Sequence, residues 1–125
     1  MERERERWRS GTGMLRLAEG QGGAGIPLEI AASYGPRHRG LLGRDGVTGA
    51  LLLTPCNMVH TLGMRFAIDV AYLDAELRVV DLHTLRPHRL ALPRLRARHA
   101  LEAEAGAMGR WGVRPGVRLL VEPGP

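Results

Sequence analysis

Side chains able to do chemistry gather between residues 56 and 69 of this sequence. Cys56 and His60 lie four positions apart, a spacing that places two side chains on one face of a helical turn. A thiol and an imidazole can bind zinc, or act together as nucleophile and base. Zinc in a structural site needs four ligands, however, and the sequence offers no second Cys-His pair and no oxyanion-hole motif. We therefore expect no metal and no cofactor, and the sequence leaves the catalytic residues unassigned.

Asp69 stands in the middle of an apolar stretch. Residues 66–73 alternate bulky with mostly small side chains, which is typical of a buried strand. A buried carboxylate is costly unless it is paired, so Asp69 needs an arginine, a backbone N–H group or a histidine as its partner. The functional hypothesis is a polar site of His60, Thr61 and Asp69; the structural alternative is a buried ion pair or capped loop that only fixes the fold.

Two further side chains, Met64 and Arg39, are candidate ligand-binding residues of the same site. We consider a binding module for a small polar ligand first. The alternative is a small hydrolase or lyase that uses the same groups. Beyond this possible ligand the partners are unknown, and neither the ligand nor a reaction can be named from these residues.

A third hypothesis is weak polyanion binding through the basic segment 86–98. This segment holds five arginines and no acid, which permits salt-sensitive binding to a polyanion. Pro87 and Pro93 disfavour a regular helix or a central strand there. The segment has no aromatic side chain on which a base could stack, so nucleic acid is not an expected partner.

The expected fold is a β-dominated α+β domain, with a compact, barrel-like mixed sheet and two short helices. The strand at 66–73 and one at 78–85 form a hairpin that turns at 74–77. The other expected strands are 14–17, 26–32, 50–54, 99–104 and 117–121. The expected helices are 36–42 and 106–111, each followed by a glycine.

Length and composition limit the protein class. The 125 residues suffice for one domain, which we expect at 14–122, between a charged, disordered tail at 1–13 and a short tail at 123–125. All 18 basic residues are arginine, which excludes Schiff-base chemistry on lysine. The sequence has no apolar run of membrane-spanning length and no apolar segment of the signal-peptide kind at its start. We therefore expect no membrane partner and a cytoplasmic location.

Several segments together resemble the domain of unknown function 192 family. They are RHRGLLGR at 37–44, VHTLGMRFAID at 59–69, Leu101-Glu102 with Gly106, and Gly112 with Gly116. The resemblance implies a compact, β-rich single domain and no known reaction. Many members carry Trp-Met-Lys-Asn-Thr before a strand that ends in Pro-Leu-Asp. Here that segment is His-Thr-Leu-Gly-Met at 60–64, and Ala67 replaces the proline, so a site built on that amide or lysine does not carry over.

Overall fold

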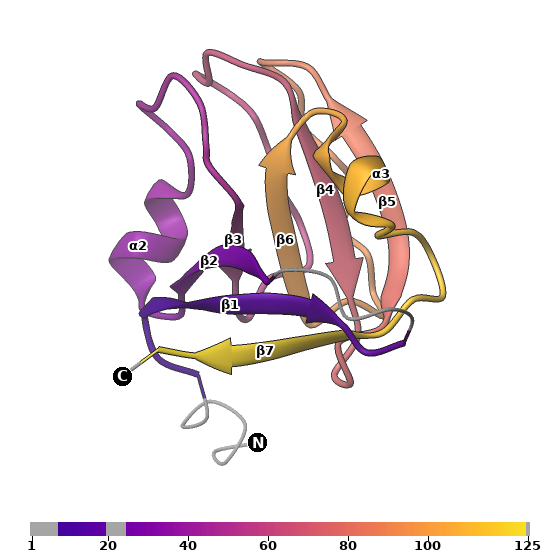
Figure 1. Ribbon diagram of the computed structural model, residues 1–125. Coiled ribbons are helices and arrows are strands. Elements are labelled where there is room, and N and C mark those ends of the chain that lie inside the picture. Colours follow the sequence, from indigo (N-terminus) through magenta and orange to yellow (C-terminus); the bar gives the residue numbers. More distant parts are fainter. Residues whose placement is uncertain (1–7, 20–24, 125) are drawn as a thin grey trace.

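A single curled sheet organises the protein. The computed structural model describes residues 8–19 and 25–124, and its seven strands follow the spatial order β5-β4-β6-β3-β2-β1-β7 (Figure 1). The strands are β1 (Gly11–Leu17), β2 (Ile26–Ala31), β3 (Ala50–Leu53), β4 (Ile68–Leu73), β5 (Val79–Leu85), β6 (His99–Glu104) and β7 (Leu119–Pro123). β2 and β3 pair in parallel and the other neighbours are antiparallel, so the sheet is mixed, as predicted.

The two edges of the sheet meet at one corner. The Val79 N–H donates to the Val117 carbonyl at 2.8 Å, and the Leu119 N–H donates to the Leu77 carbonyl at 2.9 Å. These bonds join the start of β5 to the start of β7, while β1 and β7 cross the base from which β4, β5 and β6 rise (Figure 1). The prediction of a β-dominated, barrel-like sheet with two short helices is confirmed.

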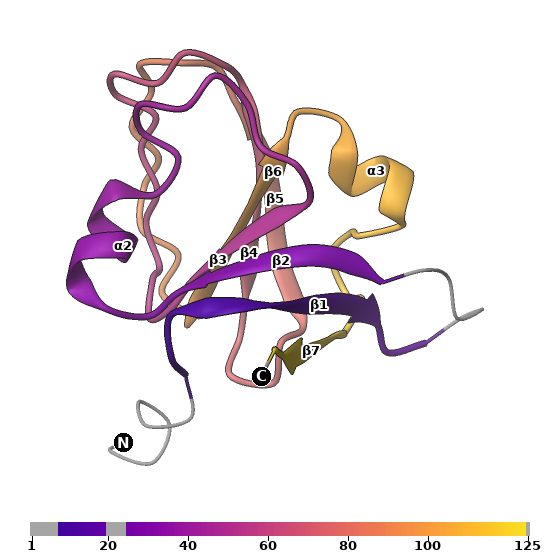
Figure 2. The ribbon, with the colours of Figure 1, turned by 60° about the vertical axis from the view of Figure 1, so that its left-hand side comes forward.

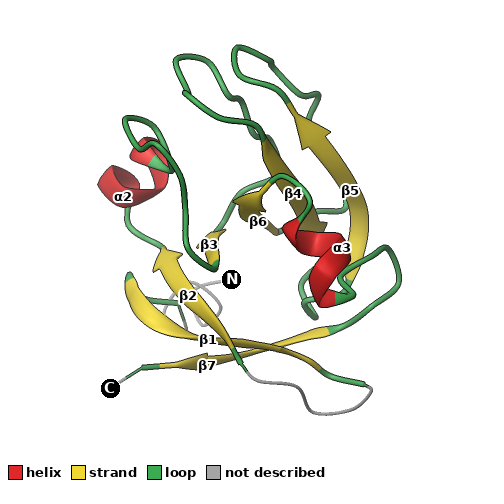
Figure 3. Cartoon of the chain, turned by 45° about the horizontal axis from the view of Figure 1, so that its top comes forward, coloured by secondary structure: helices red, strands yellow, loops and turns green. Residues whose placement is uncertain are grey.

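Strand alternation divides the core into two parts. One face of the sheet packs around residues such as Leu52, Ala71 and Leu101, and α3 (Ala107–Trp111) lies against it within the curl (Figure 3). The other face carries Leu53 and Val70, among others, in a second core. α2 (Tyr34–Arg39) and α3 lie on opposite sides of the sheet (Figure 2). We call the face with α3 the inner face and the face with α2 the outer face.

The hairpin of β4 and β5 forms without an Asn-Gly or Asp-Gly turn. The Asp74 carboxylate accepts hydrogen bonds from the backbone N–H groups of Glu76 and Arg78, at 2.9 and 3.0 Å. Leu77 takes a left-handed conformation with φ of 65°. The side chain of Asp74 therefore closes the turn, which is how these residues form a hairpin.

The sheet takes in residues that the sequence assigned to the tails. β1 begins at Gly11 and pairs with β7, which runs to Pro123, and the Gly124 N–H donates to the Thr12 carbonyl at 2.7 Å. A Cβ on Gly13 would lie 2.4 Å from the Glu122 carbonyl oxygen, so only glycine permits this close pairing. The expected disorder of residues 1–7 lies outside the described residues. Within the described ranges, no helix is long and apolar enough to cross a membrane.

Candidate functional site

Asp69 supports the fold on the inner face. The Thr84 hydroxyl donates to Asp69 Oδ1 at 2.7 Å, and the N–H groups of Gly106 and Met108 donate to Oδ2 at 2.9 and 3.2 Å. These two amides begin α3, whose first turn has no side-chain cap of its own. Asp69, on β4, therefore caps the N-terminus of α3 on the inner face of the sheet. Of its expected partners, the backbone N–H groups are the ones it contacts.

Thr61 links the segment before β4 to the segment that follows β5. Its buried hydroxyl donates to the Arg86 carbonyl and accepts from the Arg89 N–H at 2.9 Å. The His88 N–H donates to the Thr61 carbonyl at 2.8 Å. The expected grouping of His60, Thr61 and Asp69 does not form. Side-chain alternation along β4 turns Asp69 to the inner face. The Thr61 hydroxyl is already hydrogen-bonded to the backbone of the segment 86–98.

A cavity of about 90 Å³ lies on the outer face, between α2, the segment 53–64 and β6. Three of the five predicted ligand-binding residues line it: Arg39, His60 and Met64. Asp69 and Thr61 are not part of its wall. Its apolar wall comes from side chains of the second core, namely Leu41, Leu53, Val59 and Met64. We call this cavity the outer pocket.

Glu102 also lines the outer pocket, and the sequence reasoning did not select it. It lies on β6 between Leu51 of β3 and Val70 of β4, and only 3% of the residue is exposed. No described residue donates a hydrogen bond to Glu102 Oε1. Burial raises the pKa of this carboxyl to about 7, although the positive charge of Arg44 opposes the rise. The signal that drew attention to Asp69, an acid in an apolar strand, applied equally to Glu102.

Neighbouring groups explain why Glu102 Oε1 receives no hydrogen bond from the described residues. Arg44 forms two hydrogen bonds with Glu29, at 2.8 and 2.9 Å, which commits its guanidinium elsewhere. Gly40 ends α2 with φ of 50°, and a Cβ there would lie 3.7 Å from Glu102 Oε1. Glycine at position 40 therefore places no side chain, and no side-chain donor, against this oxygen.

Cys56 and His60 both line the outer pocket, as their spacing allowed. The Cys56 thiol donates to the Met58 carbonyl at 3.2 Å, and burial raises its pKa above the ordinary value. A protonated thiol is a poor nucleophile, which disfavours the nucleophile hypothesis. His60 Nδ1 accepts from the Leu62 N–H at 3.2 Å. Over residues 8–19 and 25–124, no three His, Cys, Asp or Glu residues form a group that could hold a metal ion.

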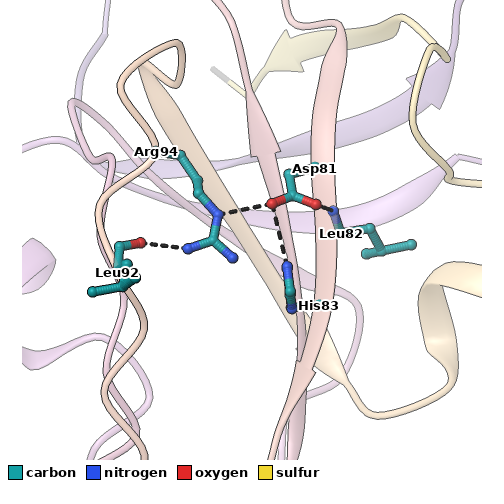
Figure 4. A network of polar contacts seen from close by, with 5 residues as sticks. All are labelled: Asp81, Leu82, His83, Leu92 and Arg94. Atoms are coloured by element: carbon teal, nitrogen blue, oxygen red, sulfur yellow. Dashed lines mark hydrogen bonds and ion pairs between the residues drawn. The ribbon is translucent and has the colours of Figure 1, made fainter.

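Arg94 belongs to a polar network on the surface of β5 (Figure 4). Its Nε donates to Asp81 Oδ2 at 2.7 Å, and the same oxygen lies 3.2 Å from His83 Nε2. The guanidinium lies 4.8 Å from the centre of the Tyr72 ring. Burial raises the pKa of Asp81, but the bonds from Arg94 and the backbone N–H of Leu82 outweigh it, and the pKa falls below its ordinary value.

The basic segment 86–98 has no helix or strand of its own, as its prolines predicted. Since Arg94 is held by Asp81, a polyanion would contact other arginines, and Arg86, Arg89 and Arg96 are exposed. Weak polyanion binding through this segment stays a prediction.

The sequence and the fold both agree with a known family. The family described as Uncharacterized ACR, or domain of unknown function 192, matches residues 16–121. The chain belongs to this family. The resemblance seen in the sequence is thereby confirmed, and membership brings no established activity with it.

Relatives and solved structures extend the comparison. A UPF0127 protein of Pyrococcus horikoshii is 33% identical over 84 residues, covering 63% of this chain and 73% of the relative. A UPF0127 protein of Pyrococcus furiosus is 32% identical over 99 residues, covering 75% and 85%. A crystal structure from Novosphingobium aromaticivorans, of a protein of unknown function, has a TM-score of 0.74 at 18% identity and covers 87% of this chain and 84% of its own. A Sinorhizobium meliloti structure has a TM-score of 0.78 at 23% identity, covering 90% and 95%. These structural likenesses concern the fold alone.

Proposed function

We propose that this family member is a small-ligand-binding module and that the outer pocket is its site. The observation that carries the proposal is Glu102, a residue of the cavity wall whose buried Oε1 receives no hydrogen bond from a described residue. Leaving a buried acceptor unsatisfied costs about 1–3 kcal/mol, and a ligand with an O–H or N–H group would recover that energy. Three residues selected from the sequence, Arg39, His60 and Met64, belong to this site.

The chemistry of the wall defines the ligand class. Leu41, Leu53 and Val59 offer apolar contact, while Glu102 offers a hydrogen-bond acceptor on the β6 side of the cavity. The ligand is therefore small, partly apolar and equipped with at least one hydrogen-bond donor. Above pH 7 the carboxylate form of Glu102 is the stronger acceptor, so a neutral hydroxyl donor binds better there than at pH 5.5.

Amide chemical shifts in a 15N-labelled sample test the site directly. The probes are 2-butanol and ethanolamine at pH 8, and we expect millimolar binding with shifts confined to the outer pocket, including Gly40 and Met64. Glu102→Leu should remove the response. Glu104→Leu is the matched control, because Glu104 lies on the same strand, is exposed and is not in the pocket wall. Shifts that ignore the pocket, or that survive Glu102→Leu, would contradict the proposal.

A second candidate is an acid–base enzyme of the hydrolase or lyase class, with Glu102 in place of the three groups first considered. A carboxyl with a pKa of about 7 can both accept and donate a proton at neutral pH, which supports this candidate. A lyase that eliminates water from a 3-hydroxy acid begins by removing a proton from the carbon next to the carboxyl group. Exchange of the C2 protons of 3-hydroxybutyrate for deuterium in D2O, present in the wild type and absent in Glu102→Gln, would support it. Equal exchange in both proteins would reject it.

A further inference from the structure

The arginines of the outer pocket differ from the described arginines that form ion pairs with carboxylates. Five arginines in the described ranges have carboxylate partners: Arg16, Arg44, Arg65, Arg94 and Arg110. Arg37 and Arg39, which line the pocket, have no ion-pair partner among the described residues. Two guanidinium groups without a counter-ion beside one cavity are able to bind an anion, because each presents several N–H donors to a carboxylate or phosphate.

The position of Arg37 connects this charge to the interior of the pocket. Arg37 is half-buried. Burial raises the pKa of the Cys56 thiol, and the positive charge of Arg37 partly opposes that rise. The guanidinium charge therefore acts on the interior of the cavity as well as on solvent. His38, between the two arginines, stacks on Tyr34 with ring centres 5.5 Å apart, which holds this turn of α2 in place.

We infer that the ligand carries an anionic group bound by Arg37 and Arg39, and an O–H or N–H group that donates to Glu102. This inference rests on the proposed function, since it assigns the two ends of a ligand in the same pocket. Leu41 and Val59 of the pocket wall would contact the short carbon chain of such a ligand. Small hydroxy acids, amino acids and phosphate esters share this chemistry, with carboxylate or phosphate as the anion.

Matched probes separate the contribution of each end. The probes 3-hydroxybutyrate and 3-aminobutyrate carry both groups, butyrate carries only the anion, and 2-butanol carries only the donor. Glycerol 3-phosphate replaces the carboxylate by a phosphate. In amide-shift titrations of the full chain at pH 8, we expect two-group probes to bind about tenfold tighter than either single-group probe. The stronger of 3-hydroxybutyrate and glycerol 3-phosphate identifies the anion.

Arginine variants locate the anion. Arg37→Gln combined with Arg39→Gln should weaken 3-hydroxybutyrate about tenfold and leave 2-butanol unchanged, and added salt should weaken only the charged probes. Arg114→Gln combined with Arg118→Gln is the control, since neither residue lines the pocket. If 2-butanol binds as tightly as 3-hydroxybutyrate, the anion inference is wrong, while the proposal that the outer pocket binds small ligands is still supported. If no probe shifts the pocket, both the inference and the proposed function are wrong.

Discussion

Asp69 and Glu102 are two buried carboxylates on neighbouring strands, and they have opposite surroundings. Asp69 lies directly across from Ala103, one position along β6 from Glu102, so the two acids face opposite sides of the sheet. Asp69 accepts three hydrogen bonds and caps a helix. Glu102 Oε1 accepts none from the described residues, and Glu102 lines the outer pocket. The comparison separates an acid that completes the fold from one that is available to a ligand.

The difference arises from what covers each face. On the inner face, α3 presents the backbone N–H groups of its first turn, and these need an acceptor. On the outer face, α2 ends at Gly40 and presents no donor to Glu102. The Tyr72 hydroxyl, on the same outer face, is also buried without a hydrogen-bond partner in the described structure. Unsatisfied polar groups therefore collect on one side of the sheet.

Asp69→Ala should produce the largest loss of stability. It leaves the first-turn amides of α3 without their acceptor, and we expect a loss of about 3 kcal/mol in the free energy of unfolding at pH 7. Urea denaturation measures the loss, with Asp45→Ala as a control, since Asp45 is exposed and its ion pair with Arg65 lies on the surface. A loss no greater than that of the control would mean that Asp69 does not support the fold.

Glu102→Gln should have the opposite effect at alkaline pH. The folded-state pKa of about 7 lies above the ordinary 4.5, so the folded protein retains a proton that the unfolded chain releases between these values. Relative to the variant, the unfolding free energy of the wild type should fall by about 3 kcal/mol as the pH rises from the ordinary pKa to the raised one. Above pH 7 the difference should level off. Unfolding free energies of both proteins at pH 5, 6, 7 and 8 give the difference curve. A flat curve would place the Glu102 carboxylate in a well-solvated or paired environment.

The strands and turns could be predicted from the sequence more fully than the grouping of the site residues. Alternation and turn residues located the strands, because these patterns are local. The placement of Glu102 opposite Val70 depends on the pairing of β6 with β4, which are far apart in the chain, and the sequence does not encode that register locally. Asp69 was recognised as a buried acid, but the donors from Gly106 and Met108 come from a distant helix. The expected site therefore joined residues that the sheet separates.

Thr84→Val tests one of the three bonds to Asp69 and should have a moderate effect. The substitution keeps the branched shape and removes only the hydroxyl that donates to Oδ1, so we expect a loss of about 1 kcal/mol. The effect should disappear in the Asp69→Ala background, because the acceptor is already absent. An undiminished loss in the double variant would assign the effect to strand propensity at position 84 and not to the hydrogen bond.

Cys56 reports the charge of Glu102 through a smaller effect. Burial is the main cause of the raised thiol pKa, and the negative charge of Glu102 adds to it. Removing that charge in Glu102→Gln should lower the pKa of the thiol slightly and increase its alkylation by iodoacetamide at pH 8 on the order of twofold. The reaction is specific, since Cys56 is the single cysteine. Asp69→Asn should leave the rate unchanged, because Asp69 faces the other side of the sheet. Equal acceleration by both variants would indicate general loosening of the fold and would remove the distinction between the two acids.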